Sequence, residues 1–412
     1  MIRDLLRFVF LFCSVSPVFV LLLTNAAVAD SLPRSGKVTG EPWVRHTIDN
    51  SSKGADGVKL ADVNGDGLLD MATGWEEGGV VKVYLNPGPS GVKNPWPSIA
   101  VGQVGSPEDA VLVDLDGDGA LEVISATEGA QRMVYIHWAP SPPADYGDVS
   151  LWHTSALPAS SGRQWLFLHP FQVDGLRGID IVAGGKNDDA WIGWFECPDD
   201  PRSVGAWKWH PFHSANWIMT ISQLDLNSDP LLDIVYTERK GDAPGVYWLQ
   251  NPGTTGTEEW ARHPIGGSGR EVMFLDTEDL NSDGKLDFAV ATRDGGVLVF
   301  EGATSAGTWH ESEIPMPENT GTGKGVAVAN MDGDGPKEIV VSCENAQDAH
   351  GVFLFDKHEE AWNARAISGL AGTKFDLVQL LDLDADGDLD VITCEERENL
   401  GVIWYENPAP RL

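Results

Sequence analysis

The sequence predicts an all-β fold, a seven-bladed β-propeller with Asp-rich loops whose ring is closed by the N-terminal strand. Three observations predict it. One pattern of short apolar runs occurs seven times, its copies lie about fifty residues apart, and the 412 residues include 46 Gly and 16 Trp. A period near fifty with short alternating runs is typical of propeller blades, whereas helical solenoids have shorter repeats with helical spacing.

Each repeat begins with two apolar runs joined by an Asp-rich loop. We expect these runs to form the first and second strands of a blade, because they are short, apolar and bounded by turn residues. The second run starts at an acidic residue that recurs every 51 to 58 positions. The seven copies of this acid are Asp70, Glu122, Asp180, Asp233, Asp287, Glu338 and Asp390.

Two further runs in each repeat predict the outer strands. An aromatic-rich run such as VKVYLNPG at 81–88 predicts the third strand, and a run that opens at or near a Trp, such as 96–101, predicts the fourth. One Trp run, at 43–48, precedes the first Asp-rich loop, and no equivalent run follows Pro408. We therefore predict that residues 43–48 complete the last blade, which removes an exposed sheet edge.

The first 29 residues have the features of an export signal. Arg3 and Arg7 form a positive start, residues 8–23 form an apolar stretch, and Ala27-Val28-Ala29 is a small-residue cleavage site. A membrane anchor is the alternative, but the apolar stretch is shorter than the ~20 residues that a bilayer core requires. The sequence therefore favours a secreted or periplasmic protein whose mature chain has no membrane span.

The predicted domains are a signal peptide at 1–29, a short linker at 30–41 and the propeller at 42–408. Cys197, Cys343 and Cys394 follow the signal. A disulfide between the last two and buried thiols remain alternatives. The formal net charge of −34 argues against a nucleic acid partner, because a polyanion would be repelled, and the 42% of hydrophobic residues argues against disorder.

The Asp-rich loops have a spacing that suits a divalent cation. In the first loop, four side chains place oxygens at positions 1, 3, 5 and 9, a glycine at position 6 allows a sharp turn, and position 7 offers a carbonyl. Hard oxygen ligands in this flexible arrangement fit Ca²⁺ better than Mg²⁺. The six sets of predicted ligands are Asp62, Asn64, Asp66 and Asp70; Asp114, Asp116, Asp118 and Glu122; Asp225, Asn227, Asp229 and Asp233; Asp279, Asn281, Asp283 and Asp287; Asn330, Asp332, Asp334 and Glu338; and Asp382, Asp384, Asp386 and Asp390.

We expect up to six structural Ca²⁺ ions in these loops. The alternative is a set of acidic turns held by side-chain hydrogen bonds without metal, and it weighs most for the fourth loop, where Pro230 replaces the glycine. In the third repeat, Gln172, Leu176 and Arg177 occupy positions that a metal site needs, so we predict no Ca²⁺ there.

These loops resemble the FG-GAP/VCBS family of extracellular propeller repeats, which also occur in the heads of integrin α-chains. The resemblance extends over essentially the whole chain after the predicted signal. It implies a seven-bladed propeller with Ca²⁺ in the loops between strands, but it does not imply one function. Members include adhesion domains, and similar propellers carry polysaccharide lyases and a sugar dehydratase.

A charged residue ends the second strand of every repeat, six positions after the last loop acid, and its sign changes around the ring. We expect these strand ends to meet at one end of the central channel and to form a ligand-binding funnel with the aromatic and acidic residues beside them. The candidate funnel residues are Trp75, Glu76, Glu128, Lys186, Trp217, Glu238, Arg239, Arg293, Glu344 and Glu396. A second ring precedes the first strands and contains Asp56, Glu108, Arg163, Gln164, Trp217, Arg270, Glu271, Lys324, Lys374 and Asp376.

A funnel with a basic side and an acidic side would orient an anionic sugar, with Arg or Lys neutralising its carboxylate and a Trp stacking on its ring. The alternative is that these are ordinary solvated turn charges. No nucleophile elbow, zinc-protease helix motif or phosphate-binding loop occurs in the chain, so the catalytic residues stay unassigned.

The leading functional hypothesis is a secreted, calcium-stabilised recognition propeller that binds carbohydrate or a cell-surface protein through the funnel. The first rival is a polysaccharide lyase or sugar dehydratase that acts on an anionic sugar at the same place, because such an enzyme needs only an acid, a base and a carboxylate neutraliser. A structural surface protein without a small ligand is the second rival. The candidates for the enzymatic roles are Lys186, Arg239, Arg293, Glu238, Glu344 and His350.

Overall fold

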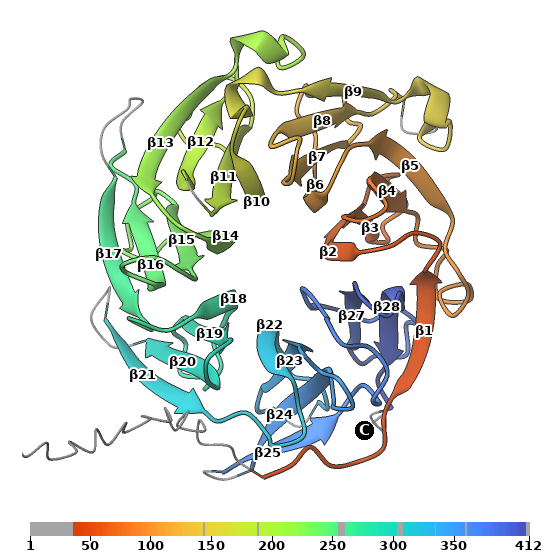
Figure 1. The fold of residues 1–412 in the computed structure, drawn as a ribbon, viewed down its shortest axis with the longest axis vertical. Helices are drawn as coiled ribbons and strands as arrows, with labels where there is room; N and C mark the ends of the chain where they lie inside the picture. Colours follow the sequence, from red (N-terminus) through yellow and green to blue (C-terminus); the bar gives the residue numbers. More distant parts are fainter. Residues whose placement is uncertain are drawn as a thin grey trace, which may run out of the picture. The chain divides into compact units, whose positions relative to one another are not determined.

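The protein is described here by a computed structural model that covers residues 36–142, 145–187, 189–253, 260–302, 308–333, 335–358 and 361–408. These residues form seven four-stranded antiparallel sheets, arranged as blades around a central axis (Figure 1). The predicted all-β seven-bladed propeller is therefore confirmed. The predicted signal peptide, part of the predicted linker and the loop residue Asp334 lie outside the described residues.

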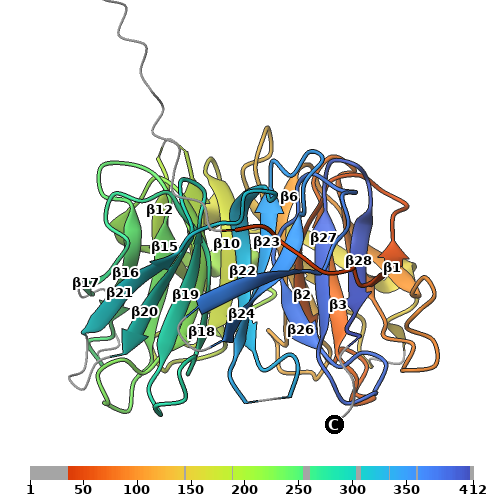
Figure 2. The same ribbon diagram turned by 90° about the horizontal axis from the view of Figure 1, so that it is seen from below.

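The strands of each blade follow one another in the sequence from the axis outwards, and Figure 2 shows them from the side. Blade 1 contains β2 (Ala55–Ala61), β3 (Asp70–Trp75), β4 (Val80–Tyr84) and β5 (Ser98–Gln103); blade 2 contains β6 (Pro107–Val113), β7 (Glu122–Thr127), β8 (Val134–Trp138) and β9 (His153–Ala156); blade 3 contains β10 (Gln164–Phe171), β11 (Asp180–Lys186), β12 (Trp191–Glu196) and β13 (Lys208–Ser214); and blade 4 contains β14 (Ile218–Leu224), β15 (Asp233–Glu238), β16 (Gly245–Gln250) and β17 (Ala261–Gly266).

The remaining blades follow the same order, except that the outer strand of the last blade comes from the start of the chain. Short 3₁₀ turns occur at Val149–Leu151, Pro158–Ser160 and Val204–Ala206. Blade 5 contains β18 (Val272–Glu278), β19 (Asp287–Thr292), β20 (Val297–Gly302) and β21 (Trp309–Ile314); blade 6 contains β22 (Thr322–Ala329), β23 (Glu338–Glu344), β24 (Val352–His358) and β25 (Ala361–Ala366); and blade 7 contains β26 (Gln379–Leu381), β27 (Asp390–Glu395), β28 (Gly401–Glu406) and β1 (Val44–Asp49).

The second strand of each blade is its most deeply buried strand. Every residue of β3, β7, β15, β19 and β27 is buried. Both faces of a blade pack against neighbouring blades, so a central strand loses contact with water on both sides and its sequence is almost continuously apolar or small. Within the described residues, no helix combines the length and the apolar character needed to cross a bilayer.

Strand β1 closes the ring, as the sequence predicted. It pairs with β28 in an antiparallel register that sets Val44 opposite Glu406 and His46 opposite Trp404 (Figure 1). The imidazole of His46 stacks on the indole of Trp404 at 4.4 Å between ring centroids, and its Nε2 lies 2.8 Å from Glu406 Oε2. The first and last parts of the chain are therefore joined by backbone and side-chain contacts.

The residues just before β1 also contact the ring, although the sequence suggested a linker. Thr39 forms a parallel bridge with Arg365 in β25 of blade 6. Its amide donates to Ala364 at 3.0 Å, and its carbonyl accepts from the Ala366 amide at 2.9 Å. The incoming chain thus crosses the outer edge of blade 6 before it completes blade 7.

The last acid of each Asp-rich loop binds backbone amides. Asp70 accepts hydrogen bonds from the amide of Val63 in its own loop, at 2.9 Å, and from that of Asn86 after β4, at 2.7 Å. Blade 3, whose loop lacks the metal pattern, has the same arrangement: Asp180 accepts from Val173 at 2.9 Å and from Cys197 at 2.8 Å. This acid therefore ties the loop to the end of the third strand whether or not a metal is bound.

The three cysteines that follow the predicted signal are buried thiols and form no disulfide within the described residues. Cys343 and Cys394 lie in β23 and β27, the second strands of neighbouring blades. The alternative of a disulfide between them is not realised in the structure.

We expect that removing residues 1–49, which include β1, will lower the melting temperature by about 10 °C or more, because the truncation strips the outer strand from blade 7 and leaves β28 as an unpaired edge. Differential scanning calorimetry and light scattering will measure the melting temperature and aggregation. Removing only residues 1–35 keeps every described contact of the ring and is the control. Equal melting temperatures for the two truncations would show that β1 does not hold the ring closed.

The Asp180→Asn substitution tests the amide contact in a blade that lacks the metal pattern. We expect it to destabilise the protein by about 1–3 kcal/mol, because the amide nitrogen that replaces one carboxylate oxygen faces a backbone N–H donor. Urea unfolding followed by tryptophan fluorescence will measure the loss. Asp199→Asn is the control, because that side chain is 97% exposed. An equal effect of both substitutions would contradict the structural role of Asp180.

Candidate functional site

The Asp-rich loops and the charged rings lie at opposite ends of the blades. In blade 1, β2 and β3 are antiparallel, with Ala61 paired to Asp70 at the loop end and Ala55 paired to Trp75 at the other end. Asp56 and Glu76 belong to this second end. The propeller therefore has a loop end, where the predicted metal ligands lie, and a funnel end, where the charged rings lie.

At the funnel end, residues of both rings line one cavity of about 300 Å³ on the axis. Its floor is apolar and includes Phe167 of β10, Phe274 of β18 and Leu377 just before β26, with Leu166 and Met219 beside them. Of the candidate funnel residues, six line the cavity directly besides Trp217. They are Glu76, Glu128, Lys186, Arg239, Arg293 and Glu344. The second ring contributes Asp56, Glu108, Lys324, Lys374 and Asp376, and the sequence analysis did not select Asp109 and Arg397, which also line it.

Trp75 and Glu238 do not line the cavity, although the sequence analysis placed them there. Trp75 is fully buried within the blade core, and its indole N–H donates to Tyr84 Oη at 2.8 Å. Glu238 is also buried and accepts from Arg262 at 2.9 Å. Each residue directly precedes a member of the ring, and neighbouring residues of a strand point to opposite faces. Proximity in sequence therefore indicated the wrong face.

Three residues of the second ring also lie elsewhere. Arg270 pairs with Glu313 at 3.0 Å, whereas Arg163 and Gln164 are not among the residues that line the cavity. Glu271 and Glu396 are not lining residues either, but both pair with cations that are. The sequence pointed only weakly to Arg397, because this residue lies one position beyond the ring of charged strand ends. It did not point to the apolar residues of the floor, because apolar residues are equally expected in a hydrophobic core.

Ion pairs between blades neutralise most of the charges in the funnel. Lys186 of blade 3 lies 2.7 Å from Glu108 and 2.6 Å from Glu128, both of blade 2. Arg239 of blade 4 lies 2.8 Å from Glu271 of blade 5. In the same way Arg293 of blade 5 pairs with Glu344 of blade 6. The lining charges of blades 1 and 2 are acidic and those of blades 3 and 4 are basic, and ion pairs join charges of opposite sign on neighbouring blades.

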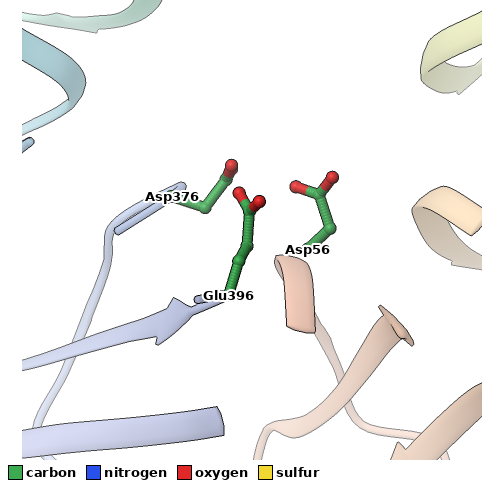
Figure 3. Close-up of side chains that lie close together, drawn as sticks. All are labelled: Asp56, Asp376 and Glu396. Atoms are coloured by element: carbon green, nitrogen blue, oxygen red, sulfur yellow. The ribbon is translucent and has the colours of Figure 1, made fainter. Parts of the chain in front are cut away.

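Three carboxyl groups meet where blade 7 faces blade 1. Oxygens of Asp56, Asp376 and Glu396 all lie within 4.8 Å of one another (Figure 3). The buried ammonium of Lys324 pairs with Asp376 and, at 2.9 Å, with Glu396. Because this ammonium already supplies positive charge, the donor set suits a lysine better than a metal ion.

Lys374 also pairs with Glu396, so two ammonium groups face three carboxyl groups, and the pKa values of Asp56 and Asp376 are shifted in opposite directions. Burial, followed by the charges of Asp376 and Glu396, raises the pKa of Asp56 well above its usual range. Burial also acts to raise the pKa of Asp376, but Lys324 and a hydrogen bond with Asp56 lower it to about 2. The pKa of Asp56 is therefore raised while that of the neighbouring Asp376 is lowered, and both residues line the cavity.

Positive charge surrounds Trp217 at the rim of the cavity. The ammonium of Lys240 lies 4.2 Å from the centroid of its ring, and the guanidinium of Arg239 lies 4.9 Å from it. The buried indole nitrogen of Trp217 has no hydrogen-bond partner in the described part of the chain. Lys240 and Arg397 are exposed, and no described carboxylate lies within salt-bridge distance of either.

At the loop end, the predicted metal ligands fold into compact loops. In the first loop, Asp62 accepts from the amides of Gly65 and Gly67 at 2.8 and 2.9 Å. Two loops bring three carboxylates so close that one oxygen of each lies within 4.8 Å of the others. These sets are Asp114, Asp116 and Glu122, and Asp382, Asp384 and Asp390. The loops thus contain acidic clusters that are able to hold a metal ion.

The third loop satisfies its own carbonyl groups. The side-chain amide of Gln172 donates to the carbonyl oxygens of Leu176 and Gly178. Gly178 occupies position 7, whose carbonyl would face the cation in the other loops. In blade 3, the side-chain amide of Gln172 therefore occupies the place that a cation would take in the other loops.

Comparisons with known proteins agree with this architecture. The FG-GAP-like repeat family matches residues 62–125, 225–290 and 279–341, so it includes Asp-rich loops of five blades. No curated protein sequence matches the chain significantly. Solved structures of similar fold include two of BBS1N in complex with ARL6DN, one soaked with mercury and one with lead.

Each of the two structures gives a TM-score of 0.51. The mercury-soaked structure is 12% identical in sequence, and the alignment covers 91% of this chain and 98% of that one. The lead-soaked structure is 11% identical, with 90% and 99% covered. At such identity the likeness shows the fold alone. The family matches and the seven sheets together show that the chain is a seven-bladed β-propeller that contains FG-GAP-like repeats in three places.

Proposed function

We propose that the protein is an exported, calcium-stabilised recognition propeller that binds a carbohydrate or a cell-surface partner in the funnel, and that an acidic sugar fits this site best. One observation carries the proposal. Among the described residues, six lysines and arginines and seven aspartates and glutamates line the cavity. The whole chain has 28 basic and 62 acidic residues. Basic side chains are therefore concentrated where a ligand would enter.

The arrangement of side chains supports an acidic sugar as the ligand. Arg397 and Lys240 lie at the rim without a carboxylate partner in the described chain, so they are available for the acidic group of a ligand. Trp217 lines the cavity and holds the cations of Arg239 and Lys240 against its ring. The volume of about 300 Å³ lies at the lower end of the range for small-molecule sites, which favours one sugar unit over a long polymer segment.

A recognition role also agrees with the fold. The similar propeller of BBS1N was solved in complex with ARL6DN. Export is supported by the signal features of residues 1–29. Calcium is supported by the loop spacing and by the two clusters of converging carboxylates, because Ca²⁺ prefers such oxygen ligands.

An enzymatic role is the second candidate, and one pair of residues favours it. Asp56 and Asp376 share a hydrogen bond at the cavity, and the pKa of Asp56 is raised whereas that of Asp376 is lowered. Two neighbouring carboxyl groups whose pKa values are shifted in opposite directions suit the acid and base roles that a sugar lyase or dehydratase needs to move a proton. The two candidate functions therefore use the same funnel but different residues.

A screen against acidic and neutral polysaccharides, in the presence of Ca²⁺, separates the two candidates. We expect acidic polymers to quench the fluorescence of the protein on binding, with no rise in ultraviolet absorbance from an unsaturated sugar. If the absorbance rises, and Asp56→Asn removes that rise without removing binding, the protein is an enzyme. If neither signal appears with any acidic polymer, the acidic-sugar proposal fails.

For a ligand found in this way, we expect Arg397→Ala to weaken binding at least about tenfold, the size of effect that a lost charged hydrogen bond produces. Titration calorimetry will measure the affinity. Lys208→Ala is the matched control, because it removes an exposed basic residue from β13 on the outside of blade 3. If both substitutions change the affinity equally, the funnel is not the binding site.

Removal of Ca²⁺ with EGTA should lower the melting temperature by about 10 °C or more. When the free Ca²⁺ concentration is a hundred times the Kd of a site, binding at that site stabilises the native state by about 2.7 kcal/mol. Asp116→Ala should reduce the number of bound ions by one in calorimetric titration. Asp174→Ala changes the same loop position in blade 3 and should leave that number unchanged. A melting temperature that is insensitive to EGTA would contradict the calcium proposal.

A further inference from the structure

A second cavity lies at the loop end, opposite the funnel. It has a volume of about 530 Å³ and opens between the Asp-rich loops of blades 3 and 4. Blade 3 contributes Phe171, Val173 and Ile179 to its walls, and blade 4 contributes Pro230 and Leu232. Its walls are mainly apolar, unlike the charged walls of the funnel.

The two loops that form this cavity are the ones that depart from the metal pattern. In the third loop, the side-chain amide of Gln172 donates to the loop carbonyl of Leu176 and lies where a cation would lie in the other loops. In the fourth loop Pro230 has no N–H group, whereas the glycine at the same position of the first loop, Gly67, donates to Asp62 at 2.9 Å. Leu232 of the fourth loop lines the cavity and is 39% exposed. Exposed apolar groups that adjoin a cavity are typical of interaction sites.

Gln223, in β14, adds a polar feature to the cavity wall. Its Oε1 atom is buried and has no hydrogen-bond donor among the described residues. A buried acceptor without a donor is costly, and such atoms are uncommon in native proteins. A ligand that brings an N–H group into the cavity would satisfy it.

The charge of this region favours a basic ligand. Asp174 lines the cavity, and no described lysine or arginine forms an ion pair with it. The chain as a whole has a formal charge of −34, which attracts basic partners at long range. The apolar walls, the acceptor without a donor and the nearby carboxylate match the apolar side chain, the backbone N–H group and the basic side chain of a peptide.

We propose that this cavity binds a basic peptide segment of a partner protein. The segment places an apolar side chain between Phe171 and Leu232, donates a backbone N–H to Gln223, and carries a lysine or arginine that faces Asp174. Because the funnel lies at the other end of the axis, both sites are able to hold their ligands at the same time.

Fluorescent heptapeptides test the proposal on the full mature protein in Ca²⁺. Their central residue is Leu, Phe or Trp, and it is flanked by Lys, by Ser or by Glu. We expect fluorescence anisotropy to show that the Lys-flanked peptides bind at least tenfold more tightly than the Glu-flanked ones.

Two variants locate the binding site. Leu232→Lys should weaken binding at least tenfold, because it adds a like charge and removes an apolar wall. Leu69→Lys is the matched control: Leu69 occupies the same loop position in blade 1 and is 37% exposed, so it should change binding less than twofold. Gln223→Leu should weaken binding without lowering the melting temperature, because the acceptor has no described donor in the unbound protein.

Several outcomes overturn the proposal. They are a lack of binding by every Lys-flanked peptide, equal affinity for Glu-flanked peptides, and equal effects of Leu232→Lys and Leu69→Lys. Sedimentation velocity adds one more. If the wild-type protein forms dimers that Leu232→Lys disperses, the cavity holds a second copy of this chain and not a partner peptide.

Discussion

The pairing of β1 with β28 is the constraint on which the rest of the structure depends. It joins the two ends of the chain, and the funnel requires it, because the carboxyl cluster is shared across this junction: Asp56 belongs to blade 1, whereas Asp376 and Glu396 belong to blade 7 (Figure 3). Further contacts cross the same junction. Lys93 of blade 1 pairs with Asp384 at 3.1 Å, and the indole of Trp404 donates to the Val92 carbonyl at 3.1 Å. An open ring would separate these groups and leave buried charges without partners.

The repeats of the sequence were sufficient to predict the blades and the closing strand, because strand number, order and turn position are all encoded locally. The funnel was predicted less completely. Trp75 and Glu238 were assigned to the wrong face, since a shift of one residue in a strand reverses the direction of the side chain. The sequence also did not predict which charged side chains form ion pairs with one another. Lys186 meets Glu108 of the preceding blade, 78 positions earlier in the chain, and only the closed ring brings them together.

The last acid of each loop shows how one sequence signal can have two causes. Its regular recurrence fits a metal ligand, but Asp180 keeps both backbone contacts in the one repeat that lacks the other metal ligands. The spacing alone does not separate these roles, because a tight turn between two strands and a cation site need an oxygen at the same place. The third and fourth repeats have lost parts of the metal pattern without losing this contact. These two loops form the second cavity.

The position of β1 also bears on how the chain folds. His46 and its partner Glu406 are separated by 360 positions, so the strand that is synthesised first meets its partner only when nearly the whole chain is available. Contacts of such long range are slow to form because the intervening chain must first be ordered. Six blades are complete within consecutive segments and are able to assemble as the chain emerges. The seventh is completed only when β28 has been made, and until then β1 is an unpaired strand that must be kept from pairing with another chain.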